Sequence, residues 1–270
     1  MTPCLLALDT STDLLAAGLL TPAGTHCINE AGAALASSRL IPALLQLLDQ
    51  GGVGFADLRA IAFGQGPGAF TGLRTACAVA QGLAFAHNTP VLAIDSLLIV
   101  AEDARLQSVR VSRDSPTRAA THPANHAANH PGADLAANQP ADWWVVMDAR
   151  MGEAYAAAYH WHGAGWQVQV APQLWTLAAL AQTWLAEPPQ RVAGSGVTAF
   201  ADALPWANAQ RWPQGANRAG ALLRLAVAAW HQGQAIAADQ ALPLYLRDKV
   251  AQTTAERLAQ RAANAAPAAA

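Results

Sequence analysis

The strongest constraint on the fold is a pattern that occurs twice: an apolar strand, an aspartate at its end, a short polar turn and a second apolar strand. The two copies are Leu5 to Leu8, Asp9 and Leu14 to Leu20 in the first half, and Trp143 to Met147, Asp148 and Glu153 to Trp161 in the second. Short apolar runs bounded by turn residues are typical of buried strands. The repeat therefore predicts an α/β protein built from two related subdomains.

Further elements are expected in both halves. In the first half they are a strand at Thr25–Glu30, a helix at Arg39–Gln50 with Pro42 in its first turn, a strand at Ala60–Phe63, a helix at Gly72–His87 capped by Thr71, and a strand at Val91–Ile94. In the second half they are a helix at Leu177–Leu185, a strand near Val192 and a helix at Arg218–Gln232. Residues 105–141 are rich in Ala, Asn, His and Pro, which predicts an insert or flexible loop. We expect an N-terminal subdomain at 1–104, this insert, a C-terminal subdomain at 142–250, and a frayed or disordered tail at 251–270.

Composition excludes several classes of function. With 53% hydrophobic and 13% charged residues, the 270-residue chain can bury a large core. A net charge of -2 and a pI of about 6.4 provide no basic surface of the kind that binds nucleic acid directly. The one lysine, Lys249, has no glycine run before it, which excludes a P-loop.

Signals for disulfides, metal sites and membrane segments are weak. The cysteines Cys4, Cys27 and Cys77 are far apart and form no C-x-x-C pair. Three histidines spaced by four, at positions 122, 126 and 130, lie inside the insert and are interrupted by prolines, so we expect no metal site there. No lysine or arginine precedes Arg39, and the longest uncharged run, 75–94, contains polar residues. We expect a cytoplasmic protein without a membrane segment.

The two repeated aspartates are the most interesting carboxylates. Asp9 and Asp148 end equivalent strands and can face each other across a cleft between the subdomains. In a phosphotransferase such carboxylates would hold a metal ion and orient a nucleophile. Aspartates in tight turns commonly cap the backbone instead, and the sequence leaves both interpretations open.

A glycine turn at 64–68 follows a strand and opens a helix. Its spacing fits a relaxed dinucleotide fingerprint, but no acidic residue lies between Asp57 and Asp95 to bind a ribose. The turn can bind an anion at the helix N-terminus, or its glycines can serve close packing alone. The residues that would form a vestigial nucleotide or anion site are Asp9, Thr10, Ser11, Gly66, Gly68, Arg74 and Asp148.

The two helices of the first half suggest a partner surface. Small residues spaced by four in the second helix permit close approach of another helix. The first helix carries more leucine than one core-facing stripe needs, which fits burial against a second chain or full burial within one domain. The expected interface residues are Leu40, Leu44, Leu47, Leu48, Gly72, Leu73, Ala76, Ala80, Leu83 and Ala84.

Five segments, taken in order, resemble the bacterial TsaB (YeaZ) family, which takes part in making threonylcarbamoyladenosine on tRNA. They are L-L-A-L-D-T-S-T at 5–12, G-Q-G-P-G-A-F-T-G-L-R-T at 64–75, P-V-L-A-I-D-S-L at 90–97, M-D-A-R-M-G-E-A-Y at 147–155 and P-L-Y-L-R-D at 243–248. The run G-P-G-A-F-T-G-L-R is the most specific of these. The matches span most of the chain apart from the insert and the tail.

The resemblance implies an actin- and hexokinase-like (ASKHA) fold of two βββαβα subdomains. It implies a non-catalytic scaffold or activating subunit without a cofactor or metal of its own, because the related TsaD subunit carries the ATP site and the metal. TsaD-type chains have an H-x-x-x-H metal pair on an N-terminal helix, whereas the helical segments before residue 98 contain only His87 here.

The resemblance also implies partners. TsaD would bind through the helices at 39–50 and 71–87, with TsaE and, functionally, TsaC as further members of the pathway. The complex transfers a threonylcarbamoyl group to the adenosine beside the anticodon, and this chain would meet tRNA only within it. Alone, the chain would form a homodimer. Two alternatives are a free-standing phosphotransferase or ATPase that uses Asp9 and Asp148, and a metallopeptidase, which the missing histidine pair disfavours.

Overall fold

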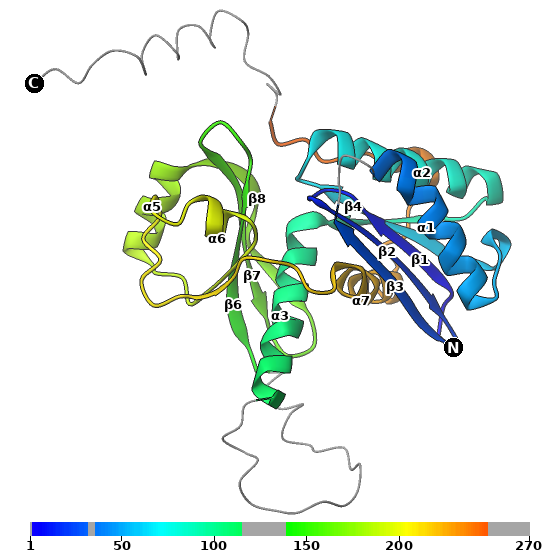
Figure 1. Ribbon diagram of the computed structural model, residues 1–270, viewed down its shortest axis with the longest axis horizontal. Helices are drawn as coiled ribbons and strands as arrows, with labels where there is room; N and C mark the ends of the chain where they lie inside the picture. The colour runs from blue at the N-terminus through cyan, green and yellow to red at the C-terminus, as the bar shows by residue number, and fades with distance from the viewer. Residues whose placement is uncertain (1, 32–35, 115–138, 248–270) are drawn as a thin grey trace, which may run out of the picture.

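Figure 1 shows the computed structural model, which describes residues 2–31, 36–114 and 139–247. The first half contains a five-stranded sheet with the strand order β3-β2-β1-β4-β5. Its elements are β1 (Leu5–Asp9), β2 (Leu14–Thr21), β3 (Gly24–Ala31), α1 (Ala36–Gly51), the short helix η2 (Phe55–Asp57), β4 (Ala60–Gly66), α2 (Phe70–His87), β5 (Val91–Asp95) and α3 (Ser96–Asp114). Strand β1 pairs antiparallel with β2 and parallel with β4, so it occupies the centre of the sheet.

The second half repeats this arrangement with the strand order β10-β9-β6-β7-β8. Its elements are β6 (Ala141–Asp148), β7 (Glu153–Trp161), β8 (Trp166–Thr176), α5 (Leu177–Ala186), β9 (Arg191–Ala193), α6 (Gly196–Ala199), β10 (Gln210–Trp212), α7 (Arg218–His231) and η4 (Ala238–Gln240). Strand β6 corresponds to β1, and each is the central strand of its sheet. The predicted duplication is confirmed, and each half adds one strand and one helix to the expected βββαβα order.

The central strand β1 is buried on both faces because helices cover both faces of its sheet. Leu6 and Leu8 belong to a core cluster with residues of α1 and α2. Leu5 and Ala7 point the other way, into a cluster with residues of α7. This alternation follows the two-residue period of a strand. A strand covered on both faces reads as a continuous apolar run, which is why L-L-A-L was recognisable.

Two helices cross between the halves. Helix α7 follows the second sheet in the chain but packs on β1, β2, β4 and β5 of the first. Helix α3 follows the first sheet, yet its residues Leu97, Ala101 and Ala104 pack with the second sheet. In Figure 1, α3 lies between the two sheets. We call the first sheet with α1, α2 and α7 the N-terminal lobe, and the second sheet with α3, α5 and α6 the C-terminal lobe.

Several expected boundaries need correction. Because α7 belongs to the N-terminal lobe, the division at residue 142 does not separate the two lobes in space. Helix α3 continues to Asp114, so residues 105–114 are helical rather than part of an irregular insert. Helix α1 begins at Ala36 and therefore contains Pro42 in its interior. Helix α2 begins at Phe70 after Ala69, so Thr71 is not its cap. The expected tail, and most of the expected insert, lie outside the described residues.

Among the helices that the structure describes, none combines the length and the apolar character needed to cross a membrane.

Candidate functional site

A cleft of about 660 Å³ lies between the two lobes, at the ends of their central strands. Ser11, which follows β1, and Gly68, which precedes α2, line it from one side, while Asp148 and Ser195 line it from the other. Ligands of open α/β sheets bind outside the carboxyl ends of the strands. The cleft is therefore the place to examine the predicted nucleotide or anion site.

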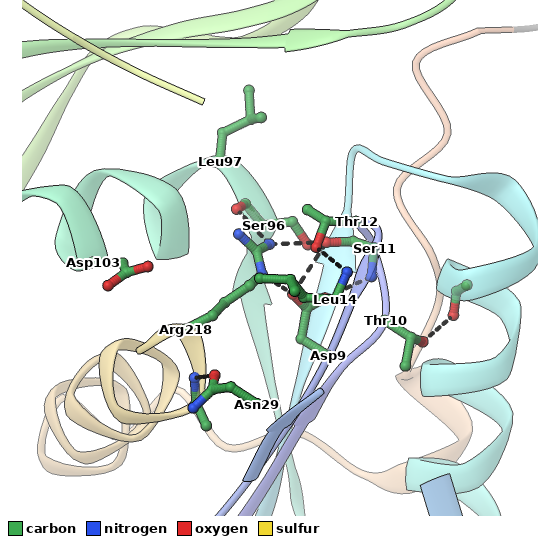
Figure 2. Close-up of polar contacts among 12 residues, drawn as sticks. Asp9, Thr10, Ser11, Thr12, Leu14, Asn29, Ser96, Leu97, Asp103 and Arg218 are labelled. Carbon is green, nitrogen blue, oxygen red and sulfur yellow. Dashed lines mark hydrogen bonds and ion pairs between the residues drawn. The ribbon is translucent and has the colours of Figure 1, made fainter. Parts of the chain in front are cut away.

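Asp9 is buried beneath the cleft and is paired with an arginine, as Figure 2 shows. The Arg218 Nε atom lies 2.5 Å from Asp9 Oδ2, and the two side chains are 4% and 0% exposed. The backbone amide of Ser11 donates a hydrogen bond to Asp9 Oδ1, and the Ser11 hydroxyl donates one to Oδ2, each with a donor–acceptor distance of 3.1 Å. Both carboxylate oxygens are thus engaged by protein groups. Asp9 is a buried structural anchor in this arrangement.

Arg218 completes a network that sequence reasoning missed. Its Nη2 atom donates to the Ser11 hydroxyl at 2.9 Å and to the carbonyl of Ser96 at 3.1 Å, so one guanidinium joins the ends of β1 and β5. Arg218 is the first residue of α7. A cation in the first turn of a helix is disfavoured by the helix dipole. The position of Arg218 was therefore the one signal in the sequence that could have indicated an acidic partner for it.

The glycine turn serves close packing. A Cβ at Gly68 would overlap the Ser11 carbonyl, and a Cβ at Gly72 would overlap the Thr10 carbonyl. The Thr10 hydroxyl donates to the Gly72 carbonyl at 2.7 Å, and the Gly66 amide donates to the Ser96 hydroxyl at 3.0 Å. The structure therefore supports the steric interpretation of the turn. The Gly66 amide, expected to face an anion, is already bonded to protein.

Two further candidates lie apart from this network. Arg74 donates from Nε to the Tyr245 hydroxyl at 3.0 Å, and its guanidinium stacks 3.9 Å from the centre of the Phe70 ring. Asp148 lines the cleft, but its carboxylate accepts a hydrogen bond from the backbone amide of Arg150 at 2.7 Å. That bond fits the turn-capping interpretation of Asp148. Of the seven predicted residues, Ser11, Gly68 and Asp148 line the cleft, and Asp9 is buried beneath it. Thr10 and Gly66 belong to the tight packing of the glycine turn, and Arg74 lies outside the cleft lining.

The predicted partner-interface residues are core residues of the monomer. Leu40, Leu44, Leu47, Leu48, Leu73, Ala76, Ala80 and Ala84 are all buried, Gly72 is buried against Thr10, and Leu83 is partly buried against the same cluster. This corrects the choice of residues, because these side chains are not available at the surface. The exposed faces of α1 and α2 carry other residues, namely Ile41, Leu45, Ala78, Gly82 and Phe85.

A partly buried acid, Asp95, lies near the interlobe boundary. The hydroxyl of Tyr159 in β7 donates a hydrogen bond of 2.5 Å to Oδ2 of Asp95, which lies at the end of β5. Burial raises the pKa of Asp95 to about 6, although the Tyr159 hydrogen bond acts in the opposite direction. Burial also raises the pKa of Tyr159 above its ordinary value, so this phenol stays a proton donor. Within the described ranges, no cluster of three or more His, Cys, Asp or Glu side chains could hold a metal ion.

Comparison with known proteins agrees with this architecture. A family model described as TsaD, tRNA N6-adenosine threonylcarbamoyltransferase, matches residues 30–121. The tRNA threonylcarbamoyladenosine biosynthesis protein TsaB of Escherichia coli K12 is 27% identical over 267 residues, covering 92% of this chain and 96% of that protein. TsaB of Haemophilus influenzae is 41% identical over 100 residues, which cover 37% of this chain and 42% of that protein.

Solved structures from the YeaZ group are similar over about nine tenths of this chain. The structure of YeaZ from Pseudomonas aeruginosa is 32% identical, with a TM-score of 0.70, and the match covers 90% of this chain and 100% of that one. A second Pseudomonas aeruginosa structure, described as similar to peptidase YeaZ, matches with a TM-score of 0.71. The two matching sheets and the TsaD-like segment fit the predicted ASKHA-like fold. The chain belongs to the TsaB (YeaZ) family.

Proposed function

We propose that this protein takes part in the biosynthesis of threonylcarbamoyladenosine on tRNA, as a non-catalytic subunit that binds a TsaD-type partner. The relatives named TsaB support the pathway. The observation that carries the non-catalytic role is the Asp9–Arg218 ion pair, because it uses the carboxylate that a phosphotransferase would need for metal binding.

The proposal places the chemistry on the partner. TsaD would supply the ATP site and the metal, and TsaE and TsaC would act in the same pathway. The net charge of -2 disfavours direct binding of tRNA, so tRNA would be met within the complex. The proposed location is the cytoplasm, where tRNA is modified. Neither the phosphotransferase nor the metallopeptidase alternative gains a supporting observation from the described residues.

The proposed docking surface is the exposed face of α1 and α2, consisting of Ile41 and Leu45 on α1 and Ala78, Gly82 and Phe85 on α2. Ile41, Leu45 and Phe85 are 48%, 51% and 63% exposed, which is unusual for large apolar side chains. Nothing lies within 4 Å of a Cβ built at Gly82, so a partner helix can approach closely there. TsaD would cover this surface, and a second copy of the chain would cover it when TsaD is absent.

Two substitutions test the docking surface. Leu45→Asp would place a charge in the buried interface, and Gly82→Arg would block close helix approach. Each should weaken TsaD binding by about 30-fold or more, as expected when a central interface residue is lost. The measurement is isothermal titration calorimetry with purified TsaD. Leu185→Asp is the matched control, because Leu185 is a 70% exposed leucine on α5 of the other lobe.

Two outcomes would contradict the proposal. Wild-type affinity of both variants would remove the docking surface, while leaving the pathway assignment in place. ATP turnover by the isolated chain that Asp9→Asn abolishes would remove the non-catalytic role.

A further inference from the structure

A short segment near the end of the described chain runs from the N-terminal lobe to the C-terminal lobe. Residues 241–247 follow η4, which packs against α2. The segment contains no helix or strand, and two of its apolar side chains, Leu242 and Tyr245, are 68% and 43% exposed. Only Ala241 is packed in the core, so core packing does not explain the path of the rest of the segment. Specific contacts at both of its ends do.

The N-terminal lobe holds the first part of this segment along α2. The Ala241 carbonyl accepts hydrogen bonds from Gln81 Nε2 at 2.8 Å and from the Cys77 thiol at 3.2 Å. The Leu244 amide donates to the carbonyl of Gln65, in the glycine turn, at 2.6 Å.

Tyr245 adds a side-chain contact near the N-terminus of the same helix. Its ring packs on Phe70 with the ring centres 5.3 Å apart, and its hydroxyl accepts from Arg74. The grip on the N-terminal lobe thus extends along α2 from Gln81 to Phe70.

The C-terminal lobe holds the last described residue. Arg247 Nη2 donates to the carbonyls of Ala149 and Arg150 at 3.0 and 3.2 Å, and it lies 2.6 Å from the carboxylate of Glu153. Its Nη1 contacts the Met151 sulfur at 3.0 Å. One side chain, 10% exposed, therefore clamps the whole turn between β6 and β7. Hydrogen bonds from a charged donor are stronger than neutral ones.

These contacts lie across the cleft from α3. Val100, Asp103 and Gln107 of α3 line the cleft, and Arg247 lines it as well. In Figure 1, α3 descends between the sheets, whereas the orange segment runs beside α2 at the top of the N-terminal lobe. Helix α3 and the connection from β10 to α7 form one joint between the lobes, because Asp103 of α3 accepts from the amides of Ala216 and Asn217. Relative motion about such a joint is the default expectation for two lobes. A second tie across the cleft opposes that motion.

We propose that residues 241–247 form an interlobe strap, which is fixed to α2 and to the β6–β7 turn and limits opening and closing of the cleft. The strap is built from this chain alone, so the inference does not depend on the proposed partner. Arg247 anchors the strap on the C-terminal lobe, and Glu153 is the acidic residue that forms an ion pair with Arg247.

The test measures the distance between the lobes in the isolated, full-length protein. A spin label on Cys27, the exposed cysteine of β3, and a second on Gln182→Cys, an exposed position of α5, report one distance for each molecule. Cys4 and Cys77 are buried and stay unlabelled. Pulsed electron spin resonance should give a narrow distribution for the wild type. Arg247→Ala should make it roughly twofold broader, because the lobes regain their freedom.

A second measurement follows the strap itself. Release of Arg247 should speed hydrogen exchange of the Leu244 amide by about tenfold or more, since that amide is protected only while the strap is seated. Arg150→Ala is the matched control: its side chain is 87% exposed, and its backbone carbonyl still accepts from Arg247. Both readouts should be unchanged in this control.

Glu153→Ala gives an independent route, because it weakens the anchor without altering the strap, and it decides the matter if Arg247→Ala does not fold. It should broaden the distribution in the same direction by a smaller amount. Wild-type distances and wild-type exchange in Glu153→Ala and in any folded Arg247→Ala protein would overturn the proposal. That result would leave TsaD binding untouched, and loss of TsaD binding would leave the strap untouched.

Discussion

Replacement of Arg218 by methionine should strongly destabilise the protein. Methionine fills much of the volume of the arginine stem but leaves the Asp9 carboxylate, 0% exposed, without its cation. The change also removes the hydrogen bonds to the Ser11 hydroxyl and the Ser96 carbonyl. Removal of one partner of a buried ion pair costs about 3–5 kcal/mol. With a urea dependence of roughly 2–3 kcal/mol per molar, the unfolding midpoint should fall by about 1–2.5 M.

The assay is urea denaturation followed by tryptophan fluorescence and by circular dichroism. Asp9→Asn and the double variant complete a double-mutant cycle, because coupled residues give a double variant less damaged than the sum of the two single changes. A loss below about 1 kcal/mol for Arg218→Met, or strictly additive losses, would refute the argument that Asp9 and Arg218 form one buried unit. Arg224→Met is the control, since Arg224 pairs with Glu102 but is 59% exposed.

Two further predictions concern α2 and the interlobe boundary. Gly72→Ala should lower the free energy of unfolding measured by urea denaturation, because its methyl group would overlap the Thr10 carbonyl. Gly82→Ala should raise that free energy by about 0.5–1 kcal/mol, since Ala favours helix and the site is open. An equal response of the two glycines would contradict the packing described for the turn. Between about pH 4 and the raised pKa of about 6, folded Asp95 holds a proton that the unfolded chain has released. This group therefore makes the protein less stable as the pH rises from about 4 to about 6. Asp95→Asn should gain stability relative to the wild type over that range in urea titrations, and the difference should level off above about pH 7. A constant difference between the two proteins across that range would show that Asp95 does not titrate in this way.

The duplicated fold could be predicted because its signal is local. Each central strand is covered on both faces, so L-L-A-L and W-W-V-V-M stand out as apolar runs that end in an aspartate. Helix α3 was not predicted, because its charged residues are buried in partnerships with distant parts of the chain. Glu102 forms ion pairs with Arg105 and Arg224 and accepts a hydrogen bond from Trp166. Asp103 accepts hydrogen bonds from the backbone amides of Ala216 and Asn217, just before α7. Such residues look like surface residues in the sequence.

The candidate site shows the same division. The equivalence of Asp9 and Asp148 followed from the repeat, but the partner of Asp9 lies 209 residues away and no local pattern pairs them. The residues expected at a partner surface lie on the buried face of α2 for a different reason. The helix carries small residues at a spacing of four on two faces, Ala76 and Ala80 inside and Ala78 and Gly82 outside. Alanine fits either environment, so periodicity alone could not orient the helix.

The exchange of helices between the lobes has a consequence for how the protein forms. During synthesis, the first sheet is complete once β5 has been made. Ile99 of α3 reaches the face that carries Leu5 and Ala7, but most of the side chains that cover this face come from α7 and are missing until that helix is available. The second sheet has α3 ready from the start. The N-terminal lobe, whose sheet is synthesised first, is therefore completed only after the second sheet has been synthesised. Because contacts between such distant segments form slowly and leave apolar surface open meanwhile, the nascent chain should depend on chaperones until residue 231 has left the ribosome.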